Sequence, residues 1–118
     1  MISEPRTLRI YSTPDGRRPF PDWIDSLTDY EARARVWVRI DRVRLGSLGD
    51  WKSVGEGVHE MRIDVGPGYR IYLGQDGKLF VILLCGGTKA TQGADIANAK
   101  RYWQDYRSRK DAEKRTIR

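Results

Sequence analysis

Residues 58–85 constrain the fold of this chain most, because their side-chain pattern is that of three short strands. Polar and apolar residues alternate over 58–64 and again over 69–73, and a continuous apolar run follows over 79–85. Gly66-Pro67-Gly68 and Gln75-Asp76-Gly77 separate the three segments, and such glycines are typical of tight turns. Since successive side chains of a strand point to opposite faces, the pattern predicts an antiparallel sheet built around this block.

The same alternation predicts a polar cluster on one face of the hairpin. Arg62 on the first strand and Arg70 and Tyr72 on the second lie on that face, together with Glu60. Arginine suits two-pronged contact with phosphate, and the phenol ring of tyrosine can stack on a base. We therefore expect this cluster to hold a phosphate with a base stacked beside it.

The rest of the chain predicts one more strand and three helices. Residues 7–12 alternate like a strand, a short helix is expected over 22–27, and a last helix over 94–110 with Trp103 and Tyr106 packed on the sheet. The last helix leads into a basic, frayed tail at 107–118. The expected fold class is α+β, a single domain over residues 1–118 with a small, mostly antiparallel twisted sheet of about four strands.

The second helix is expected from about Asp29, as its N-cap, to Leu48, with Gly49 as the residue that ends it. Its apolar residues cover most of the circumference, which predicts burial against more than one neighbour. A narrow stripe remains for the charged residues Arg35, Arg39 and Arg42. This stripe is either a solvated edge or a binding edge.

Charge and composition narrow the functional classes. The chain has 22 Lys and Arg against 16 Asp and Glu, a net charge of +6, and this excess favours a polyanionic partner. Its longest apolar run is too short to span a bilayer, and the amino terminus lacks a signal peptide's apolar segment, so we expect a cytoplasmic protein without a membrane partner. A single histidine, His59, and a single cysteine, Cys85, supply neither a disulfide nor a usual zinc ligand set, so no cofactor is expected.

Several short motifs share the order and spacing of a known family. They are Phe20-Pro21-Asp22-Trp23, the stretch from Gly49 to Ile63, Gly66-Pro67-Gly68-Tyr69-Arg70-Ile71-Tyr72, the run Leu83-Leu84-Cys85-Gly86-Gly87-Thr88-Lys89, and Gln92 with Asp95-Ile96-Ala97. This set resembles the RelE/ParE superfamily of toxins from type II toxin–antitoxin pairs. It is most similar to the HigB-like branch of phage-derived or addiction-module killer proteins. The resemblance covers nearly the whole chain up to about Trp103.

The resemblance implies a RelE-like fold and a toxin held inactive by an antitoxin. In this branch the antitoxin is usually a small helix-turn-helix DNA-binding protein, through which the complex binds operator DNA. RelE-like members cut messenger RNA on the ribosome, whereas ParE-like members share the fold but poison DNA gyrase. Because fold does not decide function, an mRNA endonuclease, a gyrase inhibitor and a non-toxic basic RNA-binding module all remain open.

Metal-free RNA cleavage uses the ribose 2′-hydroxyl as nucleophile, and it needs a base, positive charge on the phosphorane and an acid. The candidates are Glu60, Arg62, Arg70, Tyr72 and Lys89 for catalysis, with Lys52, Arg62, Arg70 and Gln92 as phosphate contacts. Lys89 is a possible base because neighbouring guanidiniums favour its neutral form. Glu60 is either a base or an ion-pair partner of Arg62, and His59 is expected to pack rather than to catalyse.

Overall fold

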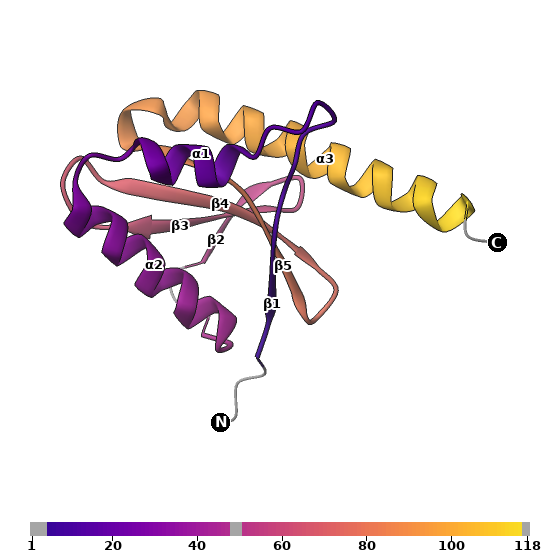
Figure 1. The fold of residues 1–118 in the computed structure, drawn as a ribbon, viewed down its shortest axis with the longest axis horizontal. Helices are drawn as coiled ribbons and strands as arrows, with labels where there is room; N and C mark the ends of the chain where they lie inside the picture. The colour runs from indigo at the N-terminus through magenta and orange to yellow at the C-terminus, as the bar shows by residue number, and fades with distance from the viewer. Residues whose placement is uncertain (1–4, 48–50, 117–118) are drawn as a thin grey trace.

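A computed structural model describes residues 5–47 and 51–116, and within them three α-helices surround one five-stranded mixed sheet (Figure 1). The fold class is α+β, as predicted. The elements are β1 (Thr7–Ile10), α1 (Pro19–Ser26), α2 (Tyr30–Arg44), β2 (Lys52–Gly55), β3 (Val58–Ile63), β4 (Tyr69–Asp76), β5 (Phe80–Thr88), a 3₁₀ turn (Lys89–Thr91) and α3 (Gln92–Thr116).

The strands lie in the order β1-β5-β4-β3-β2, and each neighbouring pair is antiparallel except the parallel pair β1 and β5. The prediction of a mostly antiparallel sheet is confirmed, but the expected count of four strands was one too low. The missed strand, β2, has four residues and reads as a glycine-rich connection. It turns into β3 through Gly55, Glu56 and Gly57, which all have positive φ.

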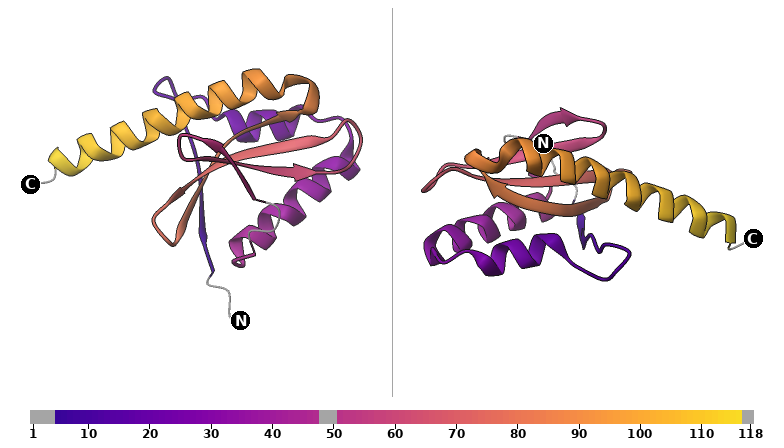
Figure 2. Two further views of the ribbon diagram at one scale, coloured as in Figure 1. Left: turned by 180° about the vertical axis from the view of Figure 1, so that it is seen from behind. Right: turned by 90° about the horizontal axis from the view of Figure 1, so that it is seen from above.

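Helices α1 and α2 cover one face of the sheet (Figure 2). Helix α1 begins at Pro19, earlier than predicted, because proline is favoured in the first turn, where its missing N–H is not needed. Asp29 caps α2 as expected, accepting hydrogen bonds from the backbone N–H groups of Glu31 and Ala32. Helix α2 ends at Arg44, followed by Gly46 with a φ of 100°, while the predicted end at Gly49 lies outside the described residues.

The buried face of α2 was predicted correctly, but its degree of burial was not. The residues that pack into the core are Ala32, Val36, Ile40 and Val43. Trp37, Val38 and Leu45 are about half exposed or more, so the helix has one buried face and not several. Within the described chain, its other side is left to solvent and to the arginine stripe.

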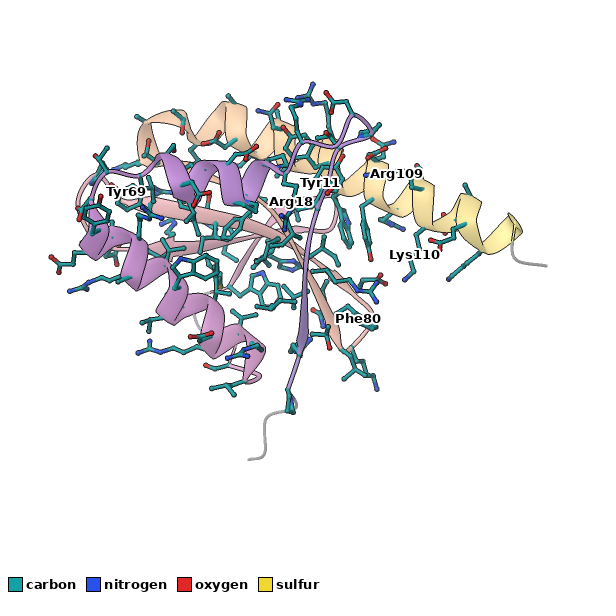
Figure 3. All side chains as sticks on the ribbon, in the orientation of Figure 1. Tyr11, Arg18, Tyr69, Phe80, Arg109 and Lys110 are labelled. Atoms are coloured by element: carbon teal, nitrogen blue, oxygen red, sulfur yellow. The ribbon has the colours of Figure 1, made fainter. Side chains whose placement is uncertain are left out.

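Helix α3 crosses the opposite face of the sheet, and its C-terminal half projects beyond the strands (Figures 1 and 2). The predicted frayed tail is wrong, because the helix continues to Thr116. Several contacts hold this half: Tyr106 and Lys110 donate to Asp76, and Asp105 accepts from Tyr11 at 2.6 Å. Figure 3 shows Tyr11 and Arg109 near each other, where the guanidinium lies 5.5 Å from the ring centroid.

Trp103 and Tyr106 pack on the sheet, as predicted. Their rings stack at 5.4 Å, and the Trp103 indole lies against the backbone of Gly74, where a Cβ atom would approach it to 2.4 Å. Helix α3 has 25 residues, but charged residues recur along it. None of the helices in the described ranges is apolar over a membrane's thickness.

Candidate nucleic-acid site

The predicted polar cluster assembles as two cross-strand rows on the face that α3 covers. Arg62 pairs with Arg70, and Glu60 pairs with Tyr72 on one side and with Lys52 on the other. Directly paired residues share a face of the sheet, so these five side chains start from one surface. The structure therefore brings together most of the residues that the sequence singled out.

Glu60 is the centre of this cluster. Its Oε1 lies 3.0 Å from Arg62 Nε, and its Oε2 lies 3.6 Å from Arg70 Nε. Gln92, the first residue of α3, donates from Nε2 to the same Oε2 at 3.1 Å. One carboxylate thus lies between two adjacent guanidiniums, which offsets the repulsion that paired like charges on neighbouring strands would otherwise cause.

The cluster is less open than the sequence predicted. Glu60 is 1% exposed and Arg70 is 6% exposed, because α3 lies over them, whereas the Arg62 side chain is 47% exposed. Holding a phosphate with a stacked base, as expected, would need exposed side chains, and Arg70 and Tyr72 are both buried. Alternation alone could not reveal that a second helical layer covers the polar face.

Tyr72 is fully buried, so it does not present its ring for stacking on a base. Burial, followed by the nearby Glu60 carboxylate, raises the pKa of its hydroxyl above the usual range. Within the described residues, this hydroxyl finds no partner at normal hydrogen-bond geometry. Any part that Tyr72 plays is therefore exerted through Glu60 and not by direct contact with RNA.

Lys89 lies beside Arg70 at the turn that enters α3. The carbonyl oxygen of Gly68 accepts from the backbone N–H of Lys89 at 2.9 Å and from Arg70 Nη1 at 3.3 Å. Lys89 itself is exposed. The structure therefore places an exposed lysine at the open end of the arginine pair.

Lys52 is exposed, but it lies in β2 and not at the tip of a loop as predicted. Gln92 is half-buried and is committed to Glu60. The two predicted phosphate contacts thus differ in the structure: Lys52 is open to solvent, and Gln92 holds the carboxylate that orients the arginines.

Asp95 is the residue near this site that sequence reasoning missed. A Cβ atom at Gly87 would lie 1.8 Å from Asp95 Oδ2, so a larger residue there would displace the Asp95 carboxylate from its place against β5. Thr91 Oγ1 donates to the same carboxylate at 2.5 Å. The signal in the sequence was the Gly86-Gly87 pair, for which a close backbone approach is one ordinary reason.

The lone cysteine and histidine are both packed. Burial raises the pKa of the Cys85 thiol to about 12, so the thiolate needed for nucleophilic chemistry is disfavoured. His59 packs edge-on against Trp51 at 4.9 Å, as predicted, and burial lowers its pKa. Among the described residues, no three His, Cys, Asp or Glu side chains are grouped so that they could share a metal ion.

The arrangement is that of an anion site at the edge of a covered sheet. Glu60 and Gln92 hold the arginines in place, and the Arg70 side chain is buried beneath the site. Arg62 and Lys89 have exposed side chains, so an incoming phosphate would meet these two first. The molecule is thus defined as a small α+β protein with a preorganised basic site built on β3 and β4.

The chain was compared with known proteins. No family model matches it. A protein of Haemophilus influenzae (strain ATCC 51907 / DSM 11121 / KW20 / Rd), which bears the name "Uncharacterized protein", is 48% identical over 81 residues, or 69% of this chain and 82% of the relative. The chain belongs to the same family as this Haemophilus influenzae protein. The relative's name assigns no activity, so function has to be argued from the site.

Proposed function

We propose that the chain is the RelE-like, HigB-like toxin of a type II toxin–antitoxin pair and acts as a ribosome-dependent mRNA endonuclease. One observation carries the proposal: Arg62 and Arg70 lie side by side across β3 and β4, and the buried Glu60 carboxylate contacts both. A buried carboxylate that orients two guanidiniums fixes the directions of their N–H groups before a ligand binds. Preorganised positive charge of this kind stabilises a phosphorane in which negative charge develops.

The reaction is a transesterification within the RNA. The ribose O2′ attacks the adjacent phosphorus, the bond from phosphorus to O5′ breaks, and a water molecule supplies the proton to the departing O5′, so the products carry a 2′,3′-cyclic phosphate and a 5′-hydroxyl. Arg62 and Arg70 balance the charge on the non-bridging oxygens. Lys89 is the proposed base for the 2′-hydroxyl proton, since it is exposed beside Arg70.

The ribosome supplies what this site lacks. Holding the 2′-hydroxyl in line with the phosphorus lowers the barrier without any strong base in the enzyme. The residue types present, two arginines and a lysine without a histidine pair, fit a mechanism that depends on such positioning. The sheet with α1 and α2 on one face and α3 on the other also supports the proposed RelE-like fold.

The test is message cleavage in a purified translation system. The protein is expected to cut mRNA only when ribosomes are present and to leave cyclic phosphate ends. Arg62→Gln and Lys89→Gln are the informative variants, because both side chains are exposed and their loss should leave the fold intact. Each is expected to reduce the cleavage rate at least about tenfold.

Arg101→Gln serves as the matched control, because it removes one exposed positive charge from α3. It is expected to cut at the wild-type rate. Equal losses in all three variants, or no cleavage with ribosomes under any condition, would overturn the endonuclease proposal.

A cognate antitoxin, proposed as a small helix-turn-helix DNA-binding protein, is the expected partner. Co-purification of this chain with the product of a neighbouring reading frame, and suppression of growth inhibition by that product, would test the pairing. Growth inhibition should also be lost in the Arg62→Gln variant while antitoxin binding survives.

A gyrase inhibitor of the ParE kind remains the second candidate, because one observation favours it. Trp37 and Val38 are 46% and 50% exposed on α2, next to the arginine stripe, as expected of a protein-binding helix. Inhibition of gyrase supercoiling that survives Arg62→Gln would support this candidate. Harmless overexpression without antitoxin would instead favour a non-toxic basic RNA-binding module.

A further inference from the structure

A second basic feature lies beside the site, between α2 and the end of β3. Strand β2 pairs with β3 only as far as Glu60, so the edge beyond that residue is not covered by β2. A groove of about 360 Å³ opens there. It is lined by Arg35, Val38, Arg39 and Arg42 from α2, by Arg62 and Ile63 at the end of β3, and by Asp64 just after it.

Among the described residues that line this groove, four guanidiniums lie against one carboxylate, so their charge is strongly unbalanced. Arg35 is joined to Glu31 by an ion pair of 3.4 Å, but both side chains are more than half exposed, so this pair is weak. Asp64 is exposed as well. The groove therefore presents a concave surface whose net charge attracts anions.

Arg39 gives the more specific signal. Its Nε and Nη2 atoms are buried, and within the described chain they find no hydrogen-bond partner. A buried guanidinium N–H without an acceptor costs free energy that an anion in the groove would recover. If the Arg39 side chain turns toward the groove, these two donors match two oxygen atoms of a phosphate or carboxylate.

The spacing of the arginines favours a chain of anions over a single one. Arg35, Arg39 and Arg42 are separated by four and three residues, so they lie on one side of α2. At 1.5 Å per residue, they are spread over roughly 10 Å along the helix axis. Arg62 belongs both to this groove and to the Glu60 cluster, so the groove runs directly into the proposed site.

We propose that this groove binds the sugar-phosphate backbone of single-stranded RNA and guides it to Arg62. The inference deepens the proposed function and rests on it for the choice of RNA as the polyanion. The arginines of α2 contact successive phosphates, and Arg62 receives the phosphate next to the scissile bond. The stripe is then a binding edge and not merely a solvated one.

The test is direct binding of a fluorescein-labelled single-stranded RNA of 12 nucleotides, followed by anisotropy without ribosomes. The test variant carries Arg35→Gln, Arg39→Gln and Arg42→Gln. Its affinity is expected to fall at least tenfold at 100 mM salt. Because each phosphate contact contributes about 0.7 to the slope of log K against log salt for single strands, the slope should become shallower by about 2.

The matched control carries Arg101→Gln, Arg107→Gln and Lys114→Gln, which remove the same charge from exposed positions of α3. The control should retain RNA affinity within about threefold and the wild-type salt slope. Circular dichroism of both variants confirms that they are folded before binding is measured. Equal weakening in the two variants would overturn the proposal, because it would show that only net charge matters.

A second outcome would also overturn it. If the groove variant binds RNA like wild type but loses affinity for a poly-glutamate peptide, the groove accepts an acidic protein segment and not RNA. The assay is independent of cleavage, so failure of the endonuclease proposal is recognised separately. A chain that never cuts message can still lose RNA affinity through the groove substitutions, and a chain that cuts can still leave the groove unused.

Discussion

The two faces of the sheet are built from different chemistry. The face under α1 and α2 is an apolar core in which Ile71 and Leu73 meet the two helices. The face under α3 also has an apolar centre around Tyr72 and Trp103, but at one end it buries the Glu60 carboxylate and the Arg70 guanidinium. Buried charges are costly even when paired. The first face therefore stabilises the fold, and the second sacrifices stability to hold a charged cluster.

Both faces nevertheless use the same device to bring a helix close. An indole lies flat against a glycine of the sheet, Trp23 on Gly86 under α1 and Trp103 on Gly74 under α3. The contrast between the faces is thus confined to the end that carries the proposed site. Four experiments test it, in order of decreasing expected effect.

The largest effect is expected from Glu60→Ala. The substitution leaves Arg70 buried without its carboxylate and should lower the free energy of unfolding by about 4 kcal/mol, measured by urea denaturation. Glu31→Ala is the control, because it breaks an exposed ion pair with Arg35 and should cost less than about 1 kcal/mol. A loss below about 1 kcal/mol for Glu60→Ala would mean that the charged end does not depend on this carboxylate.

The next comparison is between Ile71 and Tyr72, neighbours on β4 whose side chains point to opposite faces of the sheet. Ile71→Ala empties a fully buried position under α1 and α2 and should cost about 3 kcal/mol. Tyr72→Phe removes a buried hydroxyl without a partner and should leave stability unchanged or raise it by about 1 kcal/mol. A destabilised Tyr72→Phe variant would show that the hydroxyl is hydrogen-bonded in solution.

The two indole–glycine contacts should respond alike. A Cβ atom at Gly86 would lie 2.2 Å from Trp23, and one at Gly74 would lie 2.4 Å from Trp103. Gly86→Ala and Gly74→Ala should each cost about 2 kcal/mol through overpacking, measured by thermal unfolding. Gly93→Ala is the control, since a Cβ there meets nothing within 4 Å and alanine favours the helix. If Gly74→Ala leaves thermal stability unchanged while Gly86→Ala lowers it, α3 packs less tightly on the sheet than α1.

The smallest effect is expected from Asp76→Asn, which tests how α3 is anchored away from the site. Burial opposes ionisation of Asp76, but hydrogen bonds from Lys110 and Tyr106 prevail and hold its pKa below the usual value. Because the folded-state pKa is depressed, the contribution is complete above the unfolded pKa of about 4 and is lost as the pH falls through the folded value. The variant should be about 1 kcal/mol less stable at pH 7.

The same experiment has a pH-dependent readout. The difference between wild type and Asp76→Asn should stay constant from pH 7 to pH 5 and shrink below about pH 4. It is measured from urea denaturation at each pH. A difference that grows in acid would contradict the assigned direction of the pKa shift.

Much of the fold could be predicted from the sequence because local patterns decide it. Alternation and turn glycines located β3 and β4, and the Asp29 cap and helical periodicity located α2 and its buried face. The short strand β2 was not predicted because its four residues, KSVG, carry no alternation, end in Gly55 and are followed by Gly57. The full length of α3 was not predicted, because the sequence of its charged C-terminal half resembles a basic tail. The contacts of Asp76 and Asp105 that hold this half are not visible in the sequence.

The candidate site was predicted in its composition but not in its exposure. Register follows from period two, so the pairing of Arg62 with Arg70 could be expected. Burial of Glu60 and Tyr72 depends on α3 crossing the same face, and Asp95 reaches Gly87 from that helix. Contacts between segments distant in sequence carry no local signal. The contacts of α3 with the site are therefore visible only in the structure.

The pairing of β1 with β5 has a consequence for how the protein is made. Residues 7–10 can join the sheet only after residues 80–83 have left the ribosome, so the strand synthesised first is among the last to be placed. The contact of Gln92 with Glu60 comes later still, because α3 emerges after every strand. A chain still attached to the ribosome near residue 90 would thus lack the cover over its arginine pair. The site would therefore be completed only after α3 has emerged.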